Sequence, residues 1–149
     1  MIYAFQSLEE AQRSWAQETV MPPGQEQGYR QAQALLYYSV VTDDFNHDGK
    51  LTSDDPGYLF VSDKAGRSFR QISPAHQHVN SWELIQGTGR ILLHTSWDSN
   101  QDKQFTDEDE VVPLLYDLTT NAPAAPVFGP QMMAKMKTRF AKHWVPQKQ

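Results

Sequence analysis

The stretch LLYYSVVTDDFNHDGKLTSDDPGYLFVSD, residues 35–63, decides the fold, because two apolar runs flank a segment that contains five acidic residues. Runs rich in Leu, Val, Tyr and Phe that are bounded by Asp, Gly and Pro are typical of β-strands. We therefore interpret this stretch as a strand, an acidic loop and a second strand. The same order returns 54 residues later, since Asp98–Asp109 aligns with Asp44–Asp55 (98 − 44 = 54). A period of this length predicts a repeated structural unit.

Similar short runs continue through the middle of the chain. Six of them are separated by Gly, Pro, Asn and Asp: LLYYSVVT, YLFVSD, SFRQIS, NSWELI, RILLHTS and VVPLLYDL. Short connections of this kind favour antiparallel pairing. The sequence therefore predicts a mainly β protein, built on an open antiparallel β-meander of about six strands over residues 35–120.

Two helices are predicted to flank this meander. Ser7 and Glu10 form a capping box ahead of an apolar pattern, which predicts a helix over residues 8–19. Pro130 suits the first turn of a second helix, over residues 130–144, whose apolar stripe we expect to pack on the sheet with its lysines in water. A chain of 149 residues has the length of one domain, so the predicted class is α+β in a single domain.

Charge is distributed unevenly along the chain. Residues 130–149 carry five basic residues and no acidic one, whereas residues 1–129 carry eight basic and eighteen acidic residues. An acidic body does not fit nucleic-acid binding. No apolar run is long enough to span a membrane, and MIYAFQSLEE has neither the basic nor the apolar region of a signal peptide. The lack of cysteine excludes disulfides and thiolate-bound zinc.

The acidic loop of residues 44–55 has the residue types that a calcium ion needs. Calcium takes six to eight oxygen ligands, which a loop supplies from side chains at positions one, three, five, nine and twelve and a carbonyl at position seven. Gly49, at position six, permits a sharp turn. Leu51, at position eight, is expected to anchor the loop to the core. The predicted ligands are Asp44, Asn46, Asp48, the carbonyl of Lys50, Thr52 and Asp55.

The loop of residues 98–109 offers an equivalent set of ligands. Phe105 takes the position of the apolar anchor, and Lys103 stands where the first loop has glycine. A left-handed backbone at that lysine would cost on the order of 1 kcal/mol, so we expect the second calcium site to be the weaker of the two. The predicted ligands are Asp98, Asn100, Asp102, the carbonyl of Gln104, Thr106 and Asp109.

Both loops resemble the calcium-binding loops of EF-hand proteins, whose signature is D-x-[DN]-x-[DN]-G. The first loop matches it fully, and the second departs at Lys103. Position twelve is Asp in both loops instead of the longer Glu of EF-hands, which is closer to dockerin-type loops. Strands replace the flanking helices, so the resemblance implies structural calcium sites without a helix-opening switch. A purely polar turn and a magnesium site are the alternatives.

Residues 58–97 resemble a blade fragment of TolB-type β-propellers. The matching pieces are Ser62-Asp63, Gly66, Arg70-Gln71-Ile72-Ser73-Pro74, Trp82, Gly89-Arg90 and Ile91-Leu92-Leu93. A closed propeller needs at least four blades, and this chain has material for fewer than two. The resemblance therefore implies propeller-like hairpins in an open sheet, and a binding or scaffolding module more than an enzyme.

Several residues outside these loops also suggest functional sites. His76 and His78, with His94 as a third ligand, would form a zinc site of a metal-dependent hydrolase, to which loop carboxylates are an alternative. Asp63 and Asp117 are a carboxylate pair or, more simply, two turn caps. A protein partner or a second copy would dock through a sheet edge or the C-terminal helix. Millimolar calcium and the propeller-like strands favour the periplasm or the cell exterior.

Overall fold

The computed structural model describes residues 2–6 and 26–143, with side chains for residues 26–142. The helix that we expected over residues 8–19 lies outside the described residues. The elements follow in the order β1 (Ile2–Gln6), α2 (Glu26–Gln33), β2 (Leu35–Val41), β3 (Gly57–Asp63), β4 (Arg70–Gln71), β5 (Gln77–Ile85), β6 (Arg90–Trp97), β7 (Glu110–Asp117), β8 (Ala125–Pro126) and α3 (Pro130–His143). The predicted class, mainly β with helices and antiparallel sheets, is confirmed.

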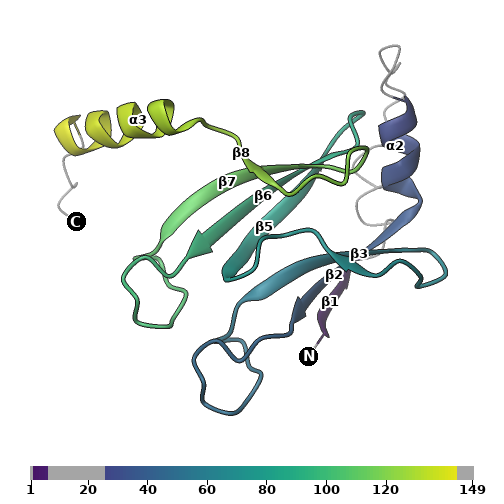
Figure 1. Cartoon of the computed structure of the whole chain (residues 1–149), viewed down its shortest axis with the longest axis horizontal. Helices are drawn as coiled ribbons and strands as arrows, with labels where there is room; N and C mark the ends of the chain where they lie inside the picture. The colour runs from purple at the N-terminus through teal and green to yellow at the C-terminus, as the bar shows by residue number, and fades with distance from the viewer. Residues whose placement is uncertain (1, 7–25, 144–149) are drawn as a thin grey trace.

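The strands form two four-stranded sheets, and all of their pairings are antiparallel (Figure 1). One sheet has the order β1-β2-β3-β4 and the other the order β5-β6-β7-β8. The six predicted strands correspond to β2 through β7, while β1 and β8 were not predicted. The single open sheet that we expected is thus divided in two. The division buries one face of each sheet against the other, which a single open meander of this size could not do.

The apolar core lies between the two sheets. Leu59 and Val61 of β3 and Ile91 and Leu93 of β6 are fully buried there. In each pair the two residues are two positions apart, so they point to the same face of their strand. Tyr37 of β2 stacks on Trp82 of β5 with ring centroids 5.0 Å apart, which ties the two sheets together.

Helix α2 closes the end of the sheets that lies opposite the two acidic loops (Figure 1). Its contact with the β5–β6 turn is made by backbone: an added Cβ on Gly28 would come within 2.6 Å of the Thr88 carbonyl oxygen. Two hydrogen bonds fix the same end, one from Gln31 Nε2 to the Leu118 carbonyl (2.8 Å) and one from the Tyr37 hydroxyl to the Ala32 carbonyl (3.0 Å). The glutamine-containing segment Glu26–Gln33 is therefore a short helix that packs on the end of the sheets.

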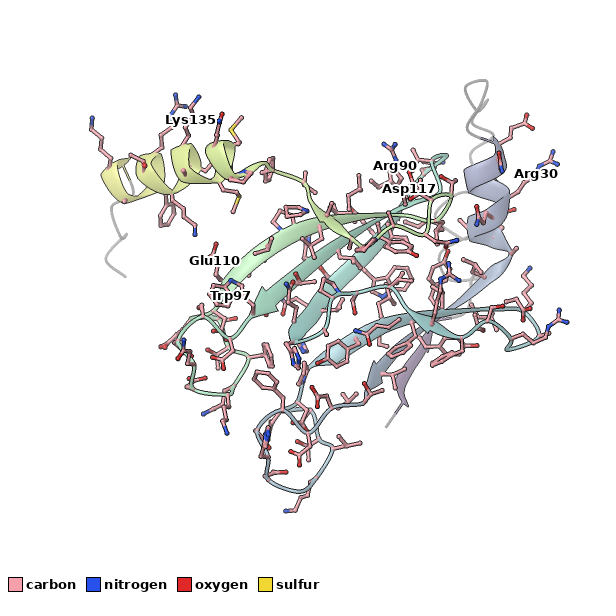
Figure 2. All side chains as sticks on the ribbon, in the orientation of Figure 1. Arg30, Arg90, Trp97, Glu110, Asp117 and Lys135 are labelled. Carbon is pink, nitrogen blue, oxygen red and sulfur yellow. The ribbon has the colours of Figure 1, made fainter. Side chains whose placement is uncertain are left out.

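Helix α3 does not pack its apolar stripe on the sheet, and this expectation was wrong. Met132, Met136 and Phe140 are 51%, 45% and 61% exposed. The cause lies in the connector: Val127 N donates to the Pro113 carbonyl oxygen (2.9 Å), which holds the chain on the edge of β7. The helix begins beyond that point, and Figure 2 shows Lys135 directed away from the sheet. Among the described residues, no helix is long and apolar enough to cross a membrane.

Candidate functional site

The two acidic loops lie at the same end of the molecule (Figure 1). The loop of residues 44–55 joins β2 to β3, and the loop of residues 98–109 joins β6 to β7. Each therefore connects the two central strands of its own sheet. The strand pairs are in register up to the loop ends, because Val41 pairs with Gly57 and Trp97 with Glu110. The paired strands therefore fix where each loop begins and ends.

The first residue of each loop organises the turn that follows it. Asp44 Oδ1 accepts from Asp48 N (3.1 Å), and its Oδ2 accepts from Gly49 N (2.9 Å). Asp98 repeats this arrangement with Asp102 N (3.0 Å) and Lys103 N (3.1 Å). A carboxylate that accepts two backbone N–H groups bends the chain around itself.

The third and fifth residues continue the same scaffold. Asn46 Oδ1 accepts from Asp48 N (2.9 Å), and Asp48 Oδ1 accepts from Lys50 N (2.8 Å). The second loop makes the two equivalent bonds, at 3.0 Å and 2.9 Å. Altogether, seven bonds from backbone N–H groups to side chains recur at an offset of 54 residues. The two loops therefore have one hydrogen-bonding design.

The last residue of each loop is a buried carboxylate. Asp55 is 1% exposed and Asp109 is 6% exposed. Asp55 accepts from Phe45 N (3.0 Å) and Thr52 N (2.9 Å), so it closes the loop between positions two and nine. Asp109 accepts in the same way, and the N–H of Thr106, followed by the donors of Ser99, holds its pKa below the usual value. Both carboxylates are therefore held in place by backbone N–H groups of their own loop.

The backbone at position six is left-handed in both loops. Gly49 has a φ of 82° and Lys103 a φ of 62°. Position four is left-handed as well, with φ of 65° at His47 and 62° at Gln101. Glycine adopts this conformation at little cost, whereas a side chain with a Cβ is strained. The second loop therefore carries the strain that the sequence predicted for Lys103.

Each predicted side-chain ligand takes part in this scaffold, and its remaining oxygen lone pairs are what a cation would use. An ionised carboxylate has about four acceptor sites, so one or two N–H groups leave it able to bind a metal ion. Within the described part of the chain, no three His, Asp or Glu side chains converge into a preformed metal group. The carboxylates accept amide hydrogens of their own loop, and binding would require them to close further around an ion.

An aromatic contact joins the two loops, and the sequence did not predict it. Phe45, at position two of the first loop, lies with its ring centroid 5.2 Å from that of Phe105, the predicted anchor of the second loop. Leu51, the predicted anchor of the first loop, is 41% exposed, so that expectation was wrong. His78 stacks on Phe105 at 5.7 Å, and burial lowers its pKa. Phenylalanine at a solvent-facing position of a polar loop was the available signal. The contact places the two loops side by side at this end of the molecule.

The three histidines of the hydrolase hypothesis contact different neighbours. His78 Nδ1 accepts from Gly57 N (3.1 Å), which occupies one ring nitrogen. His76 faces the Asp43 carboxylate at 3.6 Å, and His94 Nδ1 lies 3.2 Å from Ser81 Oγ. A zinc site needs the three rings to face one ion, whereas each ring contacts a different partner and no three such side chains form a metal group among the described residues.

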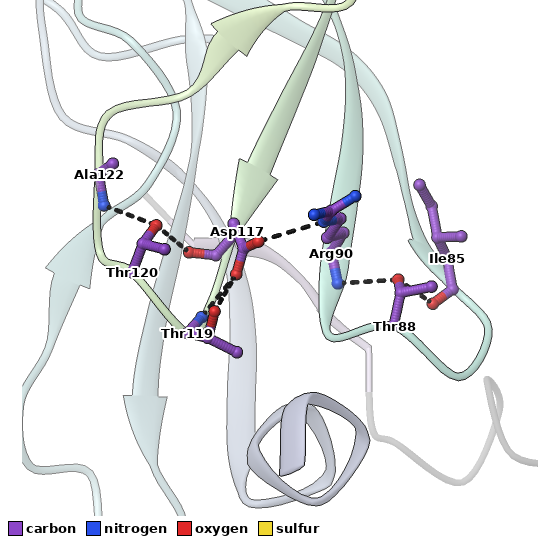
Figure 3. A network of polar contacts seen from close by, with 7 residues as sticks. All are labelled: Ile85, Thr88, Arg90, Asp117, Thr119, Thr120 and Ala122. Atoms are coloured by element: carbon purple, nitrogen blue, oxygen red, sulfur yellow. Dashed lines mark hydrogen bonds and ion pairs between the residues drawn. The ribbon is translucent and has the colours of Figure 1, made fainter. Parts of the chain in front are cut away.

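Asp63 and Asp117 serve as turn caps, the simpler of the two interpretations. Asp63 Oδ1 accepts from Ala65 N (2.9 Å) and Arg67 N (2.8 Å) in the turn after β3. Asp117 accepts from Thr119 N (2.9 Å) and from Arg90 Nε (3.1 Å), as Figure 3 shows. Each carboxylate is engaged by its own turn and a neighbouring arginine.

Replacing Lys103 by Gly is expected to raise the free energy of unfolding by about 1 kcal/mol, because glycine removes the Cβ strain of a left-handed backbone. The reverse change, Gly49→Lys, should lower it by a similar amount. Urea unfolding in EDTA measures both. Lys50→Gly is the control, since it removes a lysine side chain at position seven of the first loop, where the backbone lies outside the left-handed region. An equal gain at Lys50 would contradict the backbone explanation.

No protein-family model matches this chain, and no curated protein or solved structure shows a significant match to it.

Proposed function

We propose that this protein is a calcium-binding β-rich module in which the ions are structural and take no part in catalysis. One observation carries the proposal: two loops 54 residues apart, with the same ligand-type residues, make the same seven hydrogen bonds from backbone to side chain. A polar turn needs one or two such bonds. The recurrence of the whole set argues for a shared task that a turn alone does not require.

The chemistry of the donors favours calcium over other ions. All candidate ligands are oxygens, from carboxylates, an amide, a hydroxyl and a backbone carbonyl, and hard divalent cations prefer oxygen. Calcium accepts irregular cages of six to eight oxygens, whereas magnesium demands near-ideal octahedra and gives up its water reluctantly. A loop of twelve residues can supply the irregular cage of calcium more readily than the near-ideal octahedron of magnesium.

The ions would stabilise the end of the molecule that lies opposite α2. Residues 98–109 carry five acidic side chains within one short loop, and carboxylates a few ångströms apart repel one another. A divalent cation removes that repulsion and ties the loop to its strands. Because the loop ends are fixed by the β2–β3 and β6–β7 ladders, we propose that calcium rigidifies these hairpins. The result would be a firm platform for a binding partner.

A calcium-rich compartment fits sites of this kind. Asp at position twelve carries its carboxylate on a side chain one methylene shorter than the Glu of EF-hands, and extracellular calcium sites work with dissociation constants of about 10⁻⁴–10⁻³ M. We therefore propose a periplasmic or extracellular setting, where calcium is abundant.

Calorimetric titration tests the proposal directly. The wild-type protein, freed of metal with EDTA and dialysed, is expected to bind two calcium ions, and Asp44→Ala to bind one. Asp54→Ala is the matched control, because it removes an equal charge from the same loop without removing a proposed ligand. Binding of two ions by Asp44→Ala, or no heat up to about 10 mM calcium, would contradict the proposal.

A further inference from the structure

A cavity of about 590 Å³ opens between the edges of the two sheets, and the predicted calcium sites do not use it. One wall is Arg70–Pro74, which forms β4 and the residues after it, and the other is Tyr116 with Asn121–Ala124, ahead of β8. Both β4 and β8 are two-residue edge strands, so the cavity lies where each sheet stops pairing. Its volume falls within the range of small-molecule sites.

Arg70, on the wall of this cavity, carries a buried donor that lacks an acceptor. Its Nε atom is buried and has no hydrogen-bond partner, while its terminal Nη2 donates to Asn121 Oδ1 (2.8 Å). Arg30, Arg67 and Arg90 each pair with a carboxylate, but Arg70 pairs with no acidic group among the described residues. Buried N–H groups are nearly always satisfied, so this one calls for an acceptor.

Two further donors on the cavity wall are also without an acceptor. Ser73 Oγ accepts from Leu59 N (3.0 Å), which leaves its O–H to donate. Tyr116 is 4% exposed as a residue, and its hydroxyl, which keeps contact with solvent, makes no hydrogen bond with any described residue. This hydroxyl is therefore able to donate to a bound molecule. Arg70, Ser73 and Tyr116 thus bring three donors, and no acidic side chain, to one cavity.

We infer that this cavity binds a small monocarboxylate with an apolar body. The guanidinium fork matches a planar carboxylate, and the two hydroxyls would satisfy its remaining lone pairs. Arg70 is the one charged residue of the lining, and a single positive charge balances a monoanion better than a doubly charged phosphate. The walls contributed by Ile72, Pro74 and Pro123 suit an aliphatic or aromatic body next to the charge. The cavity shares no residue with the acidic loops, so the inference is independent of calcium.

The test uses benzoate as the probe and benzamide as its uncharged counterpart, with NMR spectra of the amide signals as the readout. Benzoate is expected to shift the signals of Ser73, Tyr116 and Asn121 in a saturable manner, and benzamide to bind at least about tenfold more weakly. Arg70→Gln should weaken benzoate about tenfold or more, and Tyr116→Phe should weaken it without a change of fold. Arg67→Gln, which removes an equal charge from the same sheet, is the control.

Three results would overturn the inference. Equal affinity for benzoate and benzamide would remove the role of the carboxylate. Unchanged benzoate affinity in both Arg70→Gln and Tyr116→Phe, in spectra that remain dispersed, would remove the role of these donors. Inorganic phosphate that binds as tightly as benzoate would show a general anion site in place of a carboxylate site.

Discussion

Calcium is expected to raise the melting temperature by roughly 3–10 °C for each loop that it fills, and EDTA to reverse the gain. At 10 mM, calcium is about 10–100 times the proposed dissociation constants, and a ligand that binds only the folded state then adds about 1.4–2.7 kcal/mol. For a chain of this length, 1 kcal/mol corresponds to about 2–4 °C. Differential scanning calorimetry with and without 10 mM calcium measures the effect. It is large because the ion relieves repulsion among acidic residues that the folded loops hold together.

Variants separate this effect from general salt stabilisation. Asp44→Ala combined with Asp48→Ala should remove about half of the shift, since the second loop remains, whereas His76→Ala should leave all of it. Magnesium at the same concentration should give a smaller shift. A calcium shift no larger than that of magnesium, or one that survives the loss of both loops' first ligands, Asp44 and Asp98, would refute the structural calcium sites.

Substitution of Gly89 by Ala is expected to destabilise the protein by about 3–5 kcal/mol, one of the largest effects of any single methyl group in this chain. A Cβ on Gly89 would lie 2.5–2.6 Å from backbone atoms of Gly28, and the residue has a φ of 64°. Neither backbone can move without lifting α2 from the β5–β6 turn. Urea unfolding followed by circular dichroism measures the loss.

Two other glycines separate the causes of that loss. Gly66 has a φ of 76° and open space around its Cβ position, so Gly66→Ala should cost about 1 kcal/mol from conformation alone. At Gly28 the structure gives only the steric cause, with a Cβ 2.6 Å from the Thr88 carbonyl oxygen. Gly28→Ala should therefore fall between the other two. If Gly66→Ala costs as much as Gly89→Ala, the close approach of α2 is not the cause.

The strands of this fold were predictable from local patterns, but their grouping was not. β2 through β7 coincide with apolar runs bounded by Gly, Pro and Asp, because each such run needs one buried face. Whether six runs form one sheet or two depends on which faces meet, and contacts such as Tyr37 on Trp82 join residues 45 positions apart. A period-two pattern contains no information about the partner sheet.

Helix α3 shows how a correct local prediction can fail in three dimensions. Its first residue was predicted, and the helix continues to His143, the last described residue, because Pro130 and the apolar spacing determine it locally. The predicted packing was wrong, since the pairing of Ala125 and Pro126 with β7 directs the chain past the end of the sheet. The one described ion pair of the helix, Lys137 to Glu110 (2.7 Å), links it to the start of β7.

The acidic loops and the cavity also differ in how far the local sequence predicts them. Every residue of an acidic loop lies within twelve positions of the others, so spacing alone predicted which side chains would be grouped. The donors of the cavity, Arg70, Ser73 and Tyr116, come from two sheets. In the sequence, Arg70 and Ser73 belong to a run that resembles a propeller blade, and nothing local marks them as part of a site. Their role as one wall of a cavity depends on where β7 and the segment before β8 lie, which no local pattern specifies.

The strand order also determines how the chain can reach this structure. Every ladder joins strands that follow one another in sequence, so most pairing closes short loops and costs little entropy. The β2–β3 and β6–β7 hairpins are connected by the two acidic loops. Closing these loops is expected to be the slow step in the formation of each hairpin. An ion that binds a loop and closes it before its strands have paired would lower the barrier to folding. We therefore expect calcium to speed refolding as well as slow unfolding.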